Sequence, residues 1–302
     1  MDLSVEVGKV GLCSPVLLAS GTAGRSDEMA AFMDLSRLGA VVTKSLAVFE
    51  WAGNPAPRLW PSPVGMLNSV GLAGPGIGHW LEVDLPRLEA AGAKVVASIW
   101  GRTPDEFGQA AQMLRDASSV IVAVEANLSC PNLERGSRPF CAFSGMAKQA
   151  IEAASEAGRP IWAKLVALAN LEELVEAVLG GGAEAVVVTN SLPAMAIDIE
   201  TRRPMLGGPG GGLSGPAIHA VAVRAIFDLR RMDPTLALVG VGGVFSGRDA
   251  LEFLMAGASA VEVGSASFSD PRAAARVAEE IEVWCQLRGV RQVREVVGAV
   301  HG

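Results

Sequence analysis

The chain has 302 residues, of which half are hydrophobic and 19% are charged, and its mean hydropathy is +0.35. This composition excludes a disordered chain, which would carry fewer apolar residues and more charge. The net charge is −7 and the lysines and arginines form no cluster, which argues against nucleic acid or an anionic membrane surface as a partner. Every apolar stretch is shorter than the roughly 18 residues that span a bilayer.

Short apolar runs rich in β-branched residues recur along the whole chain and predict eight strands. Runs of this kind are typical of parallel strands that are covered on both faces. In chain order they are Val16–Ala19, Ala40–Thr43, Lys94–Ala97, Val120–Ala126, Ile161–Ala163, Ala185–Thr189, Leu236–Val241 and Ala260–Val263.

Amphipathic patterns between these runs predict helices. One begins after Thr103, which we expect to cap it, with Pro104 in the first helical position and Glu106 completing a capping box. Asn170 is expected to cap another, which stops at the glycines of 180–182. The helical segments besides the one after Thr103 are Asp27–Leu38, Leu171–Leu179, Pro216–Arg231, Gly247–Met255 and Pro271–Leu287.

Eight strands alternating with helices predict an α/β fold, a closed parallel (β/α)8 TIM barrel formed by residues 1–302 as a single domain. An open doubly wound sheet is the alternative. The segment Gly207–Gly212 is interpreted as a mobile loop, and Gly65–Leu72 either covers a flat ring or is an ordinary loop between a strand and a helix.

In a barrel of this kind, chemistry takes place at the carboxyl ends of the strands. Lysine is almost never fully buried without a partner, and no Asp or Glu follows another strand. We therefore expect Lys44 and Lys164 to face an external anion rather than a buried carboxylate. The residues that follow the predicted strands are Ser20, Lys44, Ser98, Asn127, Lys164, Asn190, Gly242, Gly243, Gly264 and Ser265.

The segment Asn127–Asn132 places a thiol, Cys130, between two carboxamides after a strand. Pro131 restricts the backbone of Cys130 to extended conformations, which helps to orient the sulfur. A thiolate there is a candidate general base. The alternative is that Cys130 is a small buried apolar residue, which is the usual state of a free cysteine.

The glycines after the last two strands predict a phosphate site, because loops after strands seven and eight of a barrel often bind phosphate through backbone N–H groups. The G-x-G-x-x-G pattern of dinucleotide-binding folds is not met, since Phe245 occupies its last glycine position.

The remaining cysteines, Cys13, Cys141 and Cys285, lie far apart and the histidines are dispersed, so we expect no metal site. Widely spaced free cysteines also favour a reducing compartment, the cytoplasm.

These residues together resemble the catalytic subunit of class 1B dihydroorotate dehydrogenases, over about Val5 to Pro271. The cysteine at position 130 resembles the pattern of class 1 enzymes. The segment Gly65–Asn68, followed by Gly74-Pro75-Gly76, resembles the pattern of class 1B. Other segments that carry the resemblance are Ala19–Gly21, Thr43–Ser45, Gly53–Arg58, Asn68–Leu72, Asn127–Asn132, Ala163–Leu165, Asn190–Leu192, Gly211–Pro216, Gly242-Gly243 and Gly264–Ala266.

The resemblance implies FMN at the barrel mouth and oxidation of (S)-dihydroorotate to orotate in de novo pyrimidine (UMP) biosynthesis. Cys130 would remove the C5 proton while C6 delivers hydride to flavin N5, and Lys164 would stabilise charge on the reduced flavin. The implied flavin residues are Ser20, Lys44, Ser45, Ser98, Asn127, Lys164, Thr189, Gly215, Gly242, Gly243, Gly264 and Ser265. The implied substrate residues are Lys44, Asn68, Ser69, Val70, Gly71, Leu72, Asn127, Asn132, Asn190 and Ser191.

Three positions depart from the family pattern. Ser98 stands where the family usually has Asn, Val166-Ala167 stand where Ser-Pro usually follows Lys-Leu, and the bulky Trp100 lies beside the expected flavin. An alternative is therefore an FMN-dependent oxidoreductase of another cyclic amide, such as a dihydropyrimidine. A further alternative, from another functional class, is a pseudoenzyme that binds FMN or orotate as a regulatory or scaffold subunit.

The electron acceptor is not evident from the sequence. The resemblance implies a homodimer or a heterotetramer with a subunit that carries FAD and a 2Fe–2S cluster, with NAD as the final acceptor.

Overall fold

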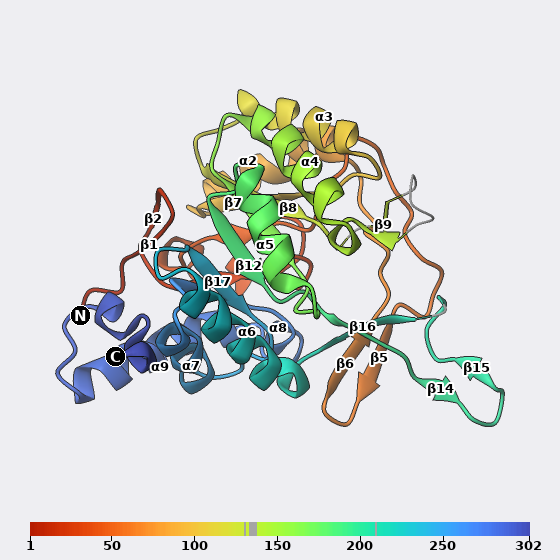
Figure 1. Ribbon diagram of the computed structural model, residues 1–302. Coiled ribbons are helices and arrows are strands. Elements are labelled where there is room, and N and C mark those ends of the chain that lie inside the picture. The colour runs from red at the N-terminus through yellow and green to blue at the C-terminus, as the bar shows by residue number, and fades with distance from the viewer. Residues whose placement is uncertain (130, 133–137, 209) are drawn as a thin grey trace.

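A computed structural model describes residues 1–129, 131–132, 138–208 and 210–302. Its centre is a closed barrel of eight parallel strands, in which β18 pairs with β3 to close the ring (Figure 1). All eight predicted strands are confirmed, and the open sheet is excluded. The barrel strands are β3 (Val16–Leu18), β4 (Val41–Val42), β7 (Val95–Ile99), β8 (Ile121–Asn127), β11 (Ile161–Leu165), β12 (Ala185–Val188), β17 (Leu238–Val241) and β18 (Ala260–Val263).

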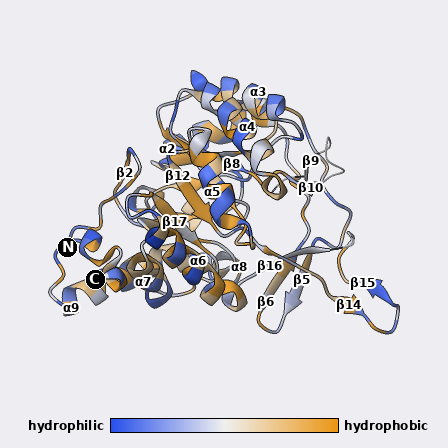
Figure 2. Cartoon of the chain, viewed as in Figure 1, coloured by the Kyte–Doolittle hydropathy of each residue, from blue (hydrophilic) through white to orange (hydrophobic). Residues whose placement is uncertain are grey.

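The barrel strands form the hydrophobic core because both of their faces are covered. All residues of β11, β12, β17 and β18 are buried, and Figure 2 shows β12 as a continuous hydrophobic strand behind the more polar helices. Valine and alanine dominate these strands, as expected for parallel strands packed between a barrel interior and a ring of helices.

Helices surround the barrel, and the neighbours α3 and α4, α4 and α5, α6 and α7, and α7 and α9 pack against one another. The two chain termini lie on the same side of the barrel (Figure 1), where Asp2 pairs with Gln292. The helices are α1 (Ile77–His79), α2 (Leu85–Ala90), α3 (Pro104–Arg115), α4 (Ser144–Ala154), α5 (Leu171–Gly180), α6 (His219–Met232), α7 (Gly247–Ala256), α8 (Ala266–Ser269) and α9 (Ala273–Leu287).

The predicted helix Asp27–Leu38 is wrong, because the chain forms two separate 3-10 turns there, Glu28–Ala31 and Leu35–Arg37. The reason is Asp34, whose side chain accepts a hydrogen bond from the backbone N–H of Ser36 and starts the second turn. An Asp that bonds the nearby backbone in this way competes with a continuous helix.

Two predicted helix caps also differ in detail. Thr103 does accept a hydrogen bond from the Glu106 N–H, but the Glu106 carboxylate binds the backbone N–H and guanidinium of Arg102, so no capping box forms. Asn170 precedes α5, yet its side-chain amide donates to the Cys141 carbonyl, 3.5 Å away, and caps nothing.

A second sheet of four antiparallel strands lies beside the barrel mouth, in the order β13–β16–β6–β5. Its strands are β5 (Leu59–Ser62), β6 (Gly65–Asn68), β13 (Leu192–Ala194) and β16 (Gly211–Ser214). The interpretation of Gly207–Gly212 as a mobile loop is therefore wrong for its last two residues, which pair in β16 with β6 and β13. Gly65–Asn68 is likewise a strand rather than an ordinary loop.

The remaining strands of the described structure form three short antiparallel pairs. These are β1 (Val5–Val7) with β2 (Val10–Leu12), β9 (Pro131–Asn132) with β10 (Arg138–Pro139), and β14 (Ile197–Asp198) with β15 (Arg203–Pro204). Across the described ranges, no helix has both the length and the apolar character needed to cross a membrane.

The α7 helix begins with a reciprocal capping box, in which Ser246 Oγ accepts from the Asp249 N–H and the Asp249 carboxylate accepts from the Ser246 N–H. We expect Ser246→Ala to lower the free energy of unfolding by about 1 kcal/mol, because it leaves a helix N–H without its cap. Urea denaturation measures this. Ser246→Thr keeps the hydroxyl and is the control; an alanine variant as stable as the threonine variant would contradict the assignment.

Candidate functional site

A cavity of about 680 Å³ opens at the carboxyl ends of the barrel strands. The second sheet forms part of its wall through residues such as Met66, Asn68 and Ser214. The structure thus brings together residues that are far apart in the sequence. The predicted cofactor and substrate residues that line the cavity are Ser20, Lys44, Ser45, Asn68, Ser69, Val70, Gly71, Leu72, Asn127, Lys164, Thr189, Asn190, Ser191, Gly215, Gly242, Gly243, Gly264 and Ser265.

Three predicted site residues are not found in this wall. Ser98 is fully buried behind Ser45, with the two hydroxyl oxygens 3.0 Å apart. Cys130 lies outside the described residues, and so does the side chain of Asn132. The assignment of Cys130 as the base therefore stays a prediction.

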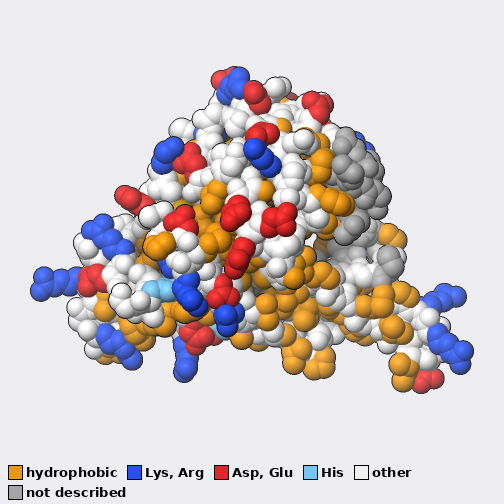
Figure 3. Space-filling model, viewed as in Figure 1, with side chains coloured by type: hydrophobic (Ala, Val, Ile, Leu, Met, Phe, Trp, Pro, Cys, Tyr) orange, Lys and Arg blue, Asp and Glu red, His pale blue; other side chains and the backbone are white. Residues whose placement is uncertain are grey.

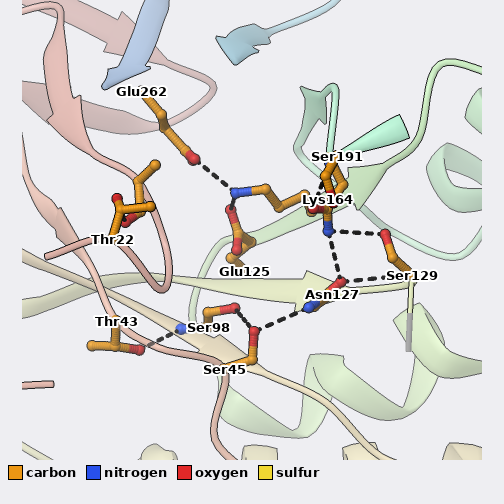
Figure 4. Close-up of polar contacts among 12 residues, drawn as sticks. Thr22, Thr43, Ser45, Ser98, Glu125, Asn127, Ser129, Lys164, Ser191 and Glu262 are labelled. Atoms are coloured by element: carbon orange, nitrogen blue, oxygen red, sulfur yellow. Dashed lines mark hydrogen bonds and ion pairs between the residues drawn. The ribbon is translucent and has the colours of Figure 1, made fainter. Parts of the chain in front are cut away.

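Ser98 begins a chain of hydrogen bonds that orients the amide of Asn127 (Figure 4). Asn127 Nδ2 donates to Ser45 Oγ at 3.0 Å, and its Oδ1 accepts from the Ser129 N–H at 3.2 Å. Asn190 Nδ2 donates to the same Oδ1 at 3.3 Å. Because both ends of the Asn127 amide have protein partners, its donor and acceptor are held in fixed directions before a ligand arrives.

The Asn190 side chain is held in the same way. Its Nδ2 also donates to Ser129 Oγ at 3.0 Å, and its Oδ1 accepts from the Ser191 N–H at 2.8 Å. Ser129 lines the cavity, although sequence reasoning did not select it. Its place inside Asn127–Asn132, next to Cys130, was the available signal.

Lys164 has counter-ions within the protein, so the prediction that it faces an external anion is wrong. Its ammonium lies between two buried carboxylates, 3.2 Å from Glu125 Oε2 and 2.7 Å from Glu262 Oε2 (Figure 4). Both glutamates lie inside strands, β8 and β18, rather than at strand ends. Among the described residues that line the cavity there is no carboxylate, but two lie immediately below it.

The charges of this cluster perturb one another. Burial alone would lower the pKa of Lys164, but attraction to Glu125 and Glu262 outweighs it and raises the pKa above its usual range. Burial raises the pKa of the Glu262 carboxyl to about 8, against the opposing effect of Lys164 and with the support of Glu125. Lys164 therefore stays charged at any physiological pH.

Lys44 is the second lysine at the mouth, and it differs from Lys164 in being only partly buried and in having no counter-ion among the described residues. It lines the cavity, and no hydrogen bond or ion pair joins it to any of the described residues. Burial, followed by repulsion from Lys164, lowers the pKa of its ammonium. The prediction that Lys44 is open to an external anion agrees with this arrangement.

Glycine is required where the chain turns after β17. Gly243 has a φ of +69°, and a Cβ there would lie 2.7 Å from His219 Cβ and 2.9 Å from the Gly215 carbonyl oxygen. Gly242 has a φ of +127°. This turn leaves the backbone of Gly242 and Gly243 open to the cavity, where N–H groups can approach an anion closely.

An aromatic cluster that sequence reasoning missed in part forms another side of the cavity. Trp51 and Trp100 line it and meet edge to face, with ring centroids 6.0 Å apart. Phe49 packs against both, and the Arg102 guanidinium lies 4.0 Å from its ring centroid. Trp100 was selected only for its bulk.

The chain matches the family model described as dihydroorotate dehydrogenase over residues 2–284. It is 41% identical over 302 residues to dihydroorotate dehydrogenase B (NAD(+)), catalytic subunit, of Trichlorobacter lovleyi, with 99% of both chains covered. It is 42% identical over 300 residues to the protein of the same name from Desulforudis audaxviator, covering 99% of this chain and 97% of that one.

A solved structure has the same fold. The chain matches a crystal structure of DHODH in complex with ferulenol from Eimeria tenella with a TM-score of 0.78 and 23% identity, covering 99% of this chain and 89% of that one.

The different environments of Lys164 and Lys44 predict different effects of removing them. Lys164→Met leaves two buried carboxylates without their cation, so we expect it to lower the free energy of unfolding by about 3–5 kcal/mol. Lys44→Met removes a partly buried cation that has no partner among the described residues, so its effect should stay within about 1 kcal/mol. Denaturant titration of the two ligand-free variants measures both; equal losses would contradict the distinction.

Proposed function

Because the chain belongs to the dihydroorotate dehydrogenase family, we propose that it oxidises (S)-dihydroorotate to orotate with bound FMN, a step of de novo UMP synthesis. The observation that carries this proposal is Lys44, a partly buried ammonium with no counter-ion among the described residues, in a cavity that also presents the amides of Asn127 and Asn190. Dihydroorotate has a matching carboxylate and a ring with amide edges.

The residues present fit FMN. The glycine turn at Gly242 and Gly243, with Gly264 and Ser265 beside it in the cavity wall, suits a phosphate group. Ser20, Ser45, Lys164, Thr189 and Gly215 supply further polar groups and close backbone approach along the wall. When bound, FMN supplies the acceptor for the hydride that leaves C6 of the substrate.

The substrate would lie against the loop Asn68–Leu72, which is already held in place. Asn68 Nδ2 donates to the Gly212 carbonyl at 3.1 Å, and Asn54 Nδ2 donates to Ser69 Oγ at 2.9 Å. Lys44 would pair with the substrate carboxylate, and Asn127, Asn132, Asn190 and Ser191 would bind the ring amides. Such fixed donors select for a ring with complementary edges, because a substrate that lacks them leaves buried polar groups unpaired.

Cys130 is the proposed base. Its thiolate takes the proton from C5 while the C6 hydride leaves, so that the C5–C6 double bond of orotate forms with its electrons balanced. The preceding residue, Ser129, is held by hydrogen bonds to the side chains of Asn127 and Asn190, which fixes the position of the chain directly before Cys130.

We also infer that residues 1–302 form one FMN-binding domain, that the chain works in the cytoplasm, and that it assembles as a homodimer. Apolar side chains are exposed on the β5–β6 and β14–β15 hairpins (Figure 3), among them Val64, Ile197 and Ile199. An apolar surface of this kind favours a protein partner. The relatives are named as catalytic subunits of an NAD(+) enzyme, which favours a heterotetramer with a subunit carrying FAD and a 2Fe–2S cluster.

Anaerobic addition of dihydroorotate to the FMN-bound protein tests this function. We expect the visible flavin absorption to bleach, because the substrate delivers its hydride to FMN without any further acceptor. Cys130→Ser should bleach about 10²–10⁴-fold more slowly, since it lacks the base, while keeping its FMN.

Dihydrouracil, which lacks the carboxylate, is the control substrate and should leave the flavin oxidised. Bleaching by dihydrouracil but not by dihydroorotate would contradict the proposal in favour of another cyclic amide. In that case Trp100 and Val166, which line the cavity, would be the first candidates for residues that change the substrate specificity. A protein that cannot be loaded with FMN would overturn the flavin assignment.

A further inference from the structure

Below the barrel mouth, two carboxylates compete for one ammonium. Glu125 and Glu262 are completely buried, and each contacts Lys164 through its Oε2. Their other oxygens, Glu125 Oε1 and Glu262 Oε1, are also buried and have no hydrogen-bond partner in the part of the chain that the structure describes. With all three groups ionised, the cluster would carry a net charge of −1 in the barrel interior.

The surrounding elements do not balance this charge. The strands β3, β4, β7, β12 and β17, which complete the barrel, contain no ionisable side chain. Another ionisable group that interacts with this cluster is Lys44, which follows β4, lines the cavity and is repelled by Lys164. An uncompensated charge in such a place is expensive, and taking up a proton is the cheaper arrangement.

We propose that Glu125 and Glu262 share one proton at neutral pH, and that this proton keeps the cluster with Lys164 neutral at the cavity that would hold FMN. The proton sits on the carboxylate pair rather than on either residue alone. The pKa of Glu262, raised to about 8 by burial first and then by Glu125, is consistent with this arrangement.

The shared proton acts on the ligand through Lys164, so Glu125 and Glu262 are positioning residues. An ammonium has three N–H donors, of which two point at the carboxylates, and Lys164 lines the cavity. While the proton is held, Lys164 presents its positive charge in a neutral cluster. When the proton is lost at alkaline pH, the net negative charge below the mouth opposes the arrival of electrons on the flavin.

The first test rests on the proposed function, because it follows the reduction potential of FMN in the protein from about pH 6 to about pH 10. The wild type and Glu262→Gln should have the same potential at the acid end, since a protonated glutamate and a glutamine are both neutral. Above about pH 8 the wild-type potential should fall below that of Glu262→Gln. Parallel curves at every pH would overturn the proposal.

Two further variants complete this test. Glu125→Gln should behave like Glu262→Gln, because either change leaves one carboxylate for one lysine. Glu176→Gln removes the same charge from an exposed position on α5 and should follow the wild type throughout. Divergence of the Glu176→Gln curve would attribute the effect to overall charge and would also overturn the proposal.

The second test needs no flavin and therefore separates failure of this proposal from failure of the proposed function. A carboxyl group whose pKa is raised in the folded state stabilises the fold less and less as the pH rises from its unfolded pKa to its folded one. The melting temperature of ligand-free Glu262→Gln should therefore rise relative to the wild type between about pH 5 and about pH 8, and then level off. A pH-independent difference in both glutamine variants would overturn the shared proton.

Discussion

The ion cluster of Lys164, Glu125 and Glu262 is the interaction on which the interior of this barrel depends. It connects β8, β11 and β18 across the barrel, while the rest of the strand interior is mostly apolar. Asn127 lies two residues beyond Glu125 on β8, so it belongs to the next layer toward the mouth. It is also the register partner of Lys164. The charged layer thus lies directly below the polar cavity.

The same constraint explains why Lys164 and Lys44 have different roles. Lys164 is held by the protein, and its charge is largely balanced before any ligand arrives. Lys44 is only partly buried and has no counter-ion in the described structure, so the protein bears the cost of its partial desolvation until an anion binds. Around them, Asn127 and Asn190 are oriented by Ser45 and Ser129. The site therefore meets its ligand with charges and dipoles already in place.

The strands were predictable because each is a short, local apolar run, and the residues after them followed from the rule that chemistry lies at strand ends. The other site residues, such as Gly215 and Ser191, were implied only by the family resemblance. The glutamates were missed because Glu125 and Glu262 lie within those runs and not at their ends. A signal existed: Glu262 precedes Gly264 by two residues, as Glu125 precedes Asn127, and side chains two apart share a face of a strand. The second sheet was missed because its pairing, such as Gly212 with Asn68, joins segments 144 residues apart.

In the proposed function, Lys44 is reserved for the ligand, whereas Lys164 is bound by the protein's own carboxylates. The most direct measurement is the dissociation constant of orotate for the FMN-bound wild type and for Lys44→Met. The loss of a charge-assisted contact with the substrate carboxylate should weaken binding by roughly 10- to 100-fold. Equal affinity of the two proteins for orotate would contradict a contact between Lys44 and the ligand carboxylate.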